Sequence, residues 1–190
     1  MVEFFDRIIV THVRYLKDDC VSMTIAMKLV INSSINYTVP LTVLLESLLV
    51  SDFDAFDDLI VVRGGAEEHR VGHRRVCDIL SIPSCKKLVF VIDTTQENFD
   101  YHGFDALYKF RTHENIADDW YFYLLDTVTF EAGFGAAFRA MQQRCASLSM
   151  ERPTILSCAL PNSNICIFNS ALVERYKGVY STEKLSKKDA

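Results

Sequence analysis

The sequence predicts a single α/β domain in which helices flank a mainly parallel central sheet. Three observations support this fold: four short apolar runs begin about thirty residues apart, each run ends in polar residues or glycine, and helical patterns fill most of the segments between and after them. Unbroken apolar runs are typical of strands that a parallel sheet buries on both faces. A length of 190 residues suits one domain with one core.

The four apolar runs are the predicted central strands. They cover residues 27–31, 59–62, 88–92 and 121–125. A later apolar run over residues 164–168 predicts one more strand, and a short helix is expected to follow over residues 170–176. Residues 7–12 are a further candidate strand, while residues 21–26 fit either a helix or a strand.

Three longer segments have the apolar spacing that is expected of amphipathic helices. The first covers residues 37–50, with Pro40 near its first turn and five leucines on one face. The second covers residues 99–110, and the third covers residues 134–145. Helices that alternate with strands in this way favour βα units and therefore a parallel sheet.

Composition and charge argue against several classes of protein. Apolar residues make up 49% of the chain and charged residues 24%, which disfavours disorder. A net charge of −5 disfavours sequence-independent nucleic-acid binding, because that binding depends on Lys and Arg contacts with phosphate. The six cysteines include no C-x-x-C pair, so we expect them to be reduced and mostly buried, as in a cytoplasmic protein.

Neither a targeting segment nor a membrane span is expected. Glu3, Asp6 and Arg7 stand where a signal peptide needs an uncharged core. Residues 153–173 form the longest uncharged stretch and are nominally long enough to cross a bilayer. This stretch contains prolines and several asparagines, so we reject a membrane helix there.

Candidate functional residues follow from the predicted strand ends. In an open parallel sheet, ligands bind beyond the carboxyl ends of the strands, near the point where the strand order reverses. The candidates at these ends are Asn32, Ser33, Arg63, Gly64, Gly65, Asp93, Asp126 and Thr127. Asp126 is the sharpest candidate, because a carboxylate there can ligate Mg²⁺ or Mn²⁺ together with substrate phosphates. The alternative is an aspartate that caps the following turn.

The other candidates also have two interpretations each. Gly64 and Gly65 either let the backbone approach a phosphate or simply form the turn after the strand, which is the commoner case. Arg63 either neutralises a phosphate or lies on the solvated rim. Asp93 either binds a ribose hydroxyl or a base edge, or caps the helix that follows.

Several standard motifs are missing from the sequence. It contains no G-x-x-x-x-G-K-[ST], no G-x-G-x-x-G after a strand and no G-x-S-x-G, which argues against a P-loop ATPase, a dinucleotide-binding domain and an α/β-hydrolase. His69 and His73 stand four residues apart, a spacing that some helical metal sites use. The stretch HRVGH lacks the glutamate of HExxH, so a solvated helix face is the favoured interpretation.

The order of these parts resembles a GT-A-type nucleotide-sugar glycosyltransferase, family 2-like, over residues 28–176. The stretch LVINSSINYTVPLTVLLESLLVS resembles the first strand, nucleotide-binding loop and first helix of that family, and DDLIVVRGGAEE resembles its second strand and polar turn. DDWYFYLLDT resembles the strand that ends in the metal-binding D-x-D motif, and SNICIFNSALVERY resembles the later strand and helix beside the acceptor site. The resemblance implies a catalytic domain at residues 1–176 and a polar tail or truncated linker at residues 177–190.

The resemblance also implies a function. The family moves a sugar from a nucleoside diphosphate sugar, usually UDP-linked, to an acceptor hydroxyl, here on a glycan or glycoprotein, with the help of Mn²⁺ or Mg²⁺. Asp126 falls where one carboxylate of D-x-D lies, but Thr127 and Val128 follow it, so the second acid is missing and Glu131 is the candidate helper. The implied catalytic residues are Asp126 and Glu131, with Asp126 as the metal ligand. The implied nucleotide-binding residues are Asn32, Ser33, Arg63, Gly64 and Asp93.

Two other hypotheses stand beside the glycosyltransferase. The incomplete D-x-D motif favours a non-catalytic α/β binding or scaffold domain that has kept the fold and lost the chemistry. The fold alone does not exclude a different phosphate-handling α/β enzyme, such as a phosphatase or nucleotidyltransferase that uses Asp93 or Asp126.

Overall fold

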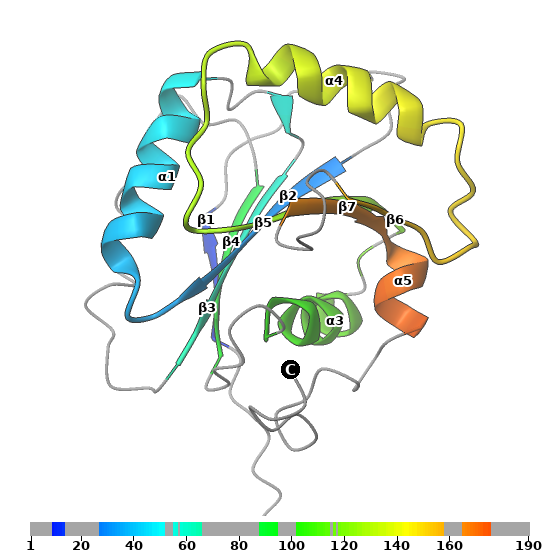
Figure 1. Cartoon of the computed structure of the whole chain (residues 1–190). Coiled ribbons are helices and arrows are strands. Elements are labelled where there is room, and N and C mark those ends of the chain that lie inside the picture. Colours follow the sequence, from blue (N-terminus) through cyan, green and yellow to red (C-terminus); the bar gives the residue numbers. More distant parts are fainter. Residues whose placement is uncertain are drawn as a thin grey trace, which may run out of the picture.

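The fold is a single mixed sheet with helices on both faces (Figure 1). The computed structural model describes residues 9–13, 27–51, 55–56, 58–65, 88–94, 102–114, 116, 118–157 and 165–175. In this part of the chain, seven strands form one sheet in the order β1-β4-β3-β2-β5-β7-β6. The strands are β1 (Ile9–Val13), β2 (Met27–Ser34), β3 (Asp58–Gly64), β4 (Leu88–Thr94), β5 (Trp120–Leu125), β6 (Ile155–Ser157) and β7 (Ile165–Asn169).

The centre of the sheet is parallel and its edges are antiparallel. Strands β4, β3, β2 and β5 pair in parallel, whereas β1 pairs antiparallel with β4, β7 with β5, and β6 with β7. The prediction of a mainly parallel sheet is therefore right for the four central strands and wrong for the edges. Parallel neighbours need a crossover of a dozen or more residues, whereas the short interval between Ser157 and Ile165 suits an antiparallel pair.

The predicted strands and helices agree with the structure in position and differ at their ends. The four central runs became β2 to β5. Strands β2, β3 and β4 continue into the polar or glycine residues beyond their apolar runs, because those residues still pair with neighbouring strands, whereas β5 ends with its apolar run at Leu125. The candidate strand at residues 7–12 is β1, and the late apolar run is β7. Strand β6 was not predicted, since three residues are too few for a recognisable pattern.

Helices cover both faces of the sheet (Figure 1). The helices are α1 (Thr38–Ser51), α3 (His102–Glu114), α4 (Phe134–Cys145) and α5 (Ser170–Arg175). Helices α1 and α4 lie on one face, and α3 and α5 lie on the other. No helix within the described ranges is long and apolar enough to cross a membrane. Where the structure describes the uncharged stretch at residues 153–173, it contains β6, β7 and the start of α5.

Two apolar cores hold the central strands between the helix layers. Under α1 and α4, the phenylalanine rings form a cluster around Phe56, with Phe138 only 4.3 Å away between ring centroids. Under α3, Phe104 stacks on Tyr123 at 4.6 Å. Cys145 and Cys166 are buried in these cores, as predicted, while the other four cysteines lie outside the described residues. Because β2, β3, β4 and β5 pair in parallel, their carboxyl ends lie at the same edge of the sheet.

Candidate functional site

The strand order reverses between β2 and β5. The chain passes from β2 to β3 and then to β4 in one direction, and it returns to β5 on the other side of β2. In open α/β sheets, the crevice for ligands lies outside the carboxyl ends of the strands at this reversal. The residues at these two ends are Ser33 and Ser34 on β2 and Asp126 directly after β5. The topology therefore selects Asp126 over Asp93, which lies on β4, two strands away from β2.

Asp126 is held in a fixed orientation at this position. The Ser33 hydroxyl donates a hydrogen bond to Oδ2 of Asp126 at 2.6 Å, and the backbone N–H of Asp126 donates to the carbonyl of Asn32 at 3.2 Å. Both side chains are buried, with Ser33 3% and Asp126 7% exposed. Burial raises the pKa of Asp126 above its ordinary value, while the hydrogen bonds from Ser33 and from the Ser34 amide oppose that shift. The result is a buried carboxylate that accepts hydrogen bonds at the strand reversal.

The first turn of α3 also lies at this edge, and no residue of it was predicted to belong to the site. The Nε2 atom of His102 lies 2.9 Å from the carbonyl oxygen of Ser33. Because a carbonyl can only accept, this nitrogen carries the proton. A Cβ on Gly103 would stand 2.6 Å from the Tyr123 hydroxyl and 2.7 Å from Oδ1 of Asn32, so α3 rests directly on β2 and β5. A glycine in the first helical turn was the available signal for this close approach.

Arg63 lies in line with Ser33 across the sheet. The two residues are partners in the β2–β3 register, and Arg63 is 1% exposed. The interpretation of Arg63 as a solvated rim residue is therefore wrong, because the side chain is buried in the sheet edge. Asp93 is the register partner of Arg63 on β4, and only its backbone position is described. The β2–β5 register pairs Asn32 with Leu125, which brings Asp126 to the same level as Ser33.

Gly64 and Gly65 form a turn at the end of β3 whose backbone is hydrogen-bonded to two neighbouring segments of the chain. The carbonyl of Gly64 accepts a hydrogen bond from the Ile35 amide at 2.7 Å, and the amide of Gly65 donates to the Thr94 carbonyl at 3.0 Å. Gly65 has a φ of +132°, and a Cβ there would meet Cγ2 of Ile35 at 2.6 Å. These contacts favour the turn interpretation of the glycine pair. Whether the Gly64 backbone also contacts a nucleotide stays a prediction.

Glu131 is not in a described contact with Asp126. Its side chain is exposed in the loop before α4, where its carbonyl accepts the Phe134 amide at 3.2 Å. The described residues contain no group of three His, Cys, Asp or Glu side chains that could hold a metal ion, and His69 and His73 lie outside these residues. Mg²⁺ is commonly held by one or two carboxylates and completed by waters and substrate phosphates. The hard carboxylate of Asp126 fits such a site as its single protein ligand.

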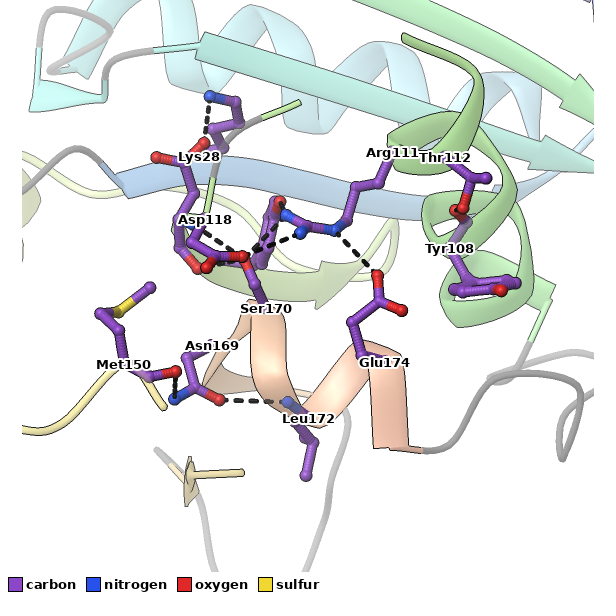
Figure 2. A network of polar contacts seen from close by, with 12 residues as sticks. Lys28, Tyr108, Arg111, Thr112, Asp118, Met150, Asn169, Ser170, Leu172 and Glu174 are labelled. Carbon is purple, nitrogen blue, oxygen red and sulfur yellow. Dashed lines mark hydrogen bonds and ion pairs between the residues drawn. The ribbon is translucent and has the colours of Figure 1, made fainter. Parts of the chain in front are cut away.

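The opposite edge of the sheet has different chemistry (Figure 2). At the amino ends of the strands, the Nζ atom of Lys28 lies 2.6 Å from Asp119 and 3.3 Å from Asp58. Burial acts to lower the pKa of Lys28, but the hydrogen bond and charge of Asp119, together with the charge of Asp58, outweigh burial and raise it. The charges at this edge are paired within the protein, which indicates a structural role.

Arg111 on α3 joins three further elements at this amino edge. Its guanidinium donates to the hydroxyls of Tyr121 and Ser170 and forms an ion pair with Asp118 at 3.2 Å (Figure 2). The Ser170 hydroxyl in turn accepts a hydrogen bond from the Asp119 amide at 2.7 Å. These contacts attach α3 and α5 to β5. Helix α3 is therefore anchored at its end by Arg111 and contacts the candidate site at its beginning through His102.

Comparison with known proteins shows a shared fold. Neither a protein-family model nor a curated protein sequence matches the chain. Among solved structures, a mannosyltransferase from Pyrobaculum calidifontis, determined in complex with GDP-Man and Mn²⁺, superposes with a TM-score of 0.57 at 11% identity. The match covers 81% of this chain and 47% of that protein, so the chain corresponds to about half of its length. At this identity, the likeness shows the fold alone.

Proposed function

We propose that the chain is a GT-A-type glycosyltransferase domain that binds a nucleoside diphosphate sugar and transfers the sugar to an acceptor hydroxyl. The observation that carries this proposal is the fixed carboxylate of Asp126 at the strand reversal, in a fold that it shares with a mannosyltransferase. The sequence resemblance favours UDP as the nucleotide, whereas the similar structure contains GDP-Man. Both nucleotides therefore belong in any test.

The described residues suggest how the site would work. Asp126 would hold Mn²⁺ or Mg²⁺ together with the two phosphates, and the bound metal would offset the charge that develops on the departing diphosphate. The β2 end, with Asn32 and Ser33, would form the floor of the site beside Arg63. The transfer breaks the bond from the anomeric carbon to the diphosphate oxygen and forms one to the acceptor oxygen. The nucleoside diphosphate leaves, and the hydroxyl proton passes to a base or to solvent.

A ligand that binds only the folded protein raises its stability, by about 2.7 kcal/mol at a hundred times Kd. We therefore expect a panel of UDP-sugars and GDP-sugars with Mn²⁺ to include at least one that raises the melting temperature. Asp126→Ala should abolish this rise. Asp118→Ala is the matched control, because this exposed carboxylate lies at the opposite edge and should leave the rise unchanged. The absence of a rise with every nucleotide sugar would contradict the proposal.

A non-catalytic binding or scaffold domain is the second candidate function. It is favoured by the absence of an acid at Thr127 and Val128, and by the absence of a three-ligand metal group among the described residues. On this hypothesis, nucleotide sugars leave the melting temperature unchanged and Asp126→Ala retains full binding to a protein partner. Transfer of a radiolabelled sugar to any glycan or glycoprotein acceptor would exclude it.

A further inference from the structure

The Ser33 hydroxyl is directed at Asp126 and is not available as a surface contact for a nucleotide. Its distance to Oδ2 of Asp126 is 2.6 Å, whereas the next acceptor, the Ser34 carbonyl, is 3.3 Å away. The shorter bond to a carboxylate is also the stronger one, because an ionised acceptor about doubles the strength of a hydrogen bond. The hydroxyl therefore acts on Asp126, although Ser33 was predicted from the sequence to bind the nucleotide.

Ser33 is itself held from three sides. Its backbone is in register with Arg63 on β3, and its carbonyl accepts the hydrogen bond from His102 on α3. The preceding residue, Asn32, pairs with Leu125 on β5 and accepts the amide of Asp126. Three elements that are far apart in the sequence thus determine where the Ser33 hydroxyl lies. A hydroxyl whose position is fixed in this way can orient a neighbouring side chain that would otherwise rotate.

The terminal torsion of an aspartate is loose. Rotation of a carboxylate about χ2 is broad and roughly two-fold, so packing alone does not set the plane of its oxygens. The hydrogen bond from the Ser33 hydroxyl to Oδ2 acts together with the backbone amides of Ser34 and Asp126 to select one plane for the carboxylate. Partners of this kind, which orient a metal-binding carboxylate without touching the metal, typically change metal affinity by about 10–100-fold when removed.

We propose that Ser33 is a positioning residue that sets the plane of the Asp126 carboxylate for the cation and diphosphate, an inference that rests on the proposed function. Ser33 touches neither the sugar nor the nucleotide in this account. It acts through Asp126, and the His102 contact with the Ser33 carbonyl keeps the hydroxyl in place.

The first experiment needs no ligand. Crystal structures of the protein and of its Ser33→Ala and Ser33→Thr variants should show the Asp126 carboxylate in one plane when a hydroxyl is present and rotated or split between orientations in Ser33→Ala. An unchanged carboxylate in Ser33→Ala would overturn the positioning role. A melting curve for each variant confirms that it folds, and Ser33→Thr retains the hydroxyl on a residue that strands accept well.

The second experiment separates the metal from the nucleotide. Calorimetric titration with UDP and with GDP, in Mn²⁺ and in EDTA, gives the factor by which Mn²⁺ tightens binding. Ser33→Ala should reduce this factor about 10–100-fold and leave the Kd in EDTA unchanged, and Ser33→Thr should restore it. Ser51→Ala is the control, because it deletes a hydroxyl that donates within α1 to Ser47 and Leu48.

The outcomes distinguish the two proposals. An equal loss of affinity in Mn²⁺ and in EDTA would mean that Ser33 contacts the nucleotide directly, and it would overturn the positioning role alone. An unchanged Mn²⁺ factor in Ser33→Ala would do the same. If the unmodified protein binds neither nucleotide in Mn²⁺, the proposed function fails, and the crystal structures still decide whether Ser33 orients Asp126.

Discussion

Strand β5 has a buried aspartate at each end, and the two are stabilised in different ways. Asp119, before the strand, faces the ammonium of Lys28 at 2.6 Å and lies in the field of Arg111. Asp126, after the strand, accepts hydrogen bonds from the Ser33 hydroxyl and from backbone amides. Burying a charge is unfavourable unless a partner compensates it. The carboxylate at the amino edge is paired with cations of the protein itself, whereas we propose that the carboxylate of Asp126 receives its cation with a ligand.

The largest effect is expected at the paired edge. Lys28→Met leaves Asp119 and Asp58 buried without their cation and should lower the free energy of unfolding by about 3–5 kcal/mol, measured by urea denaturation. Adding Asp119→Asn to this variant should recover part of the loss, because one uncompensated charge disappears. A loss below about 1 kcal/mol for Lys28→Met would show that the pair is no more important than an exposed one.

A substitution where α3 packs on the carboxyl edge of the sheet should have an intermediate effect on stability. Gly103→Ala places a Cβ against the buried side chains of Tyr123 and Asn32, so the helix or these side chains must shift, and we expect a loss of about 1–3 kcal/mol in stability and weaker nucleotide binding. Gly133→Ala is the control. Its φ of +87° brings backbone strain, but its Cβ would meet nothing within 4 Å, so nucleotide binding should stay unchanged. Equal binding by both variants would contradict the placement of α3 in the site.

The smallest effect on the free energy of unfolding is expected at Asp126, where the substitution should raise stability and not lower it. Burial raises the pKa of this carboxyl, so the folded protein binds the proton more tightly than the unfolded chain does. The resulting stabilisation is present below the pKa of the unfolded chain and is lost as the pH rises through the folded pKa. Asp126→Asn, which can still accept the Ser33 hydrogen bond, should therefore be more stable than the unmodified protein at neutral pH, and the difference should shrink toward acidic pH. Denaturation curves between pH 4 and pH 7.5 measure this, and a variant that is less stable at neutral pH would contradict it.

Much of the fold was predictable because buried strands and buried helix faces have recognisable patterns of apolar residues in the sequence. The run that became β5 is apolar and aromatic on both faces, and Asp126 after it marks where the strand ends. The antiparallel edges were not predictable, because the local sequence of β7 does not indicate whether it pairs parallel or antiparallel with β5. Lys28 illustrates the same limit: it interrupts an apolar strand, and its partner Asp119 lies 91 residues further along the chain.

The candidate site was predictable as a set of residues and not as an arrangement. Asp93 and Asp126 follow equally good strands, and only the strand order places Asp126 at the reversal and Asp93 away from it. The Ser33–Asp126 bond joins residues 93 positions apart, and the contact from His102 to Ser33 joins residues 69 positions apart. Such pairings depend on strand order and register, and a continuous apolar run that is buried on both faces has no alternating pattern to fix either of them.

The most direct test is a crystal structure of the protein grown with Mn²⁺ and either GDP-mannose or a UDP-sugar. We predict that the metal ion and the diphosphate lie beside the Asp126 carboxylate, with the Ser33 hydroxyl still bonded to Oδ2. A nucleotide bound elsewhere, or a diphosphate beside β2 and β5 with Asp126 turned away from it, would contradict the account.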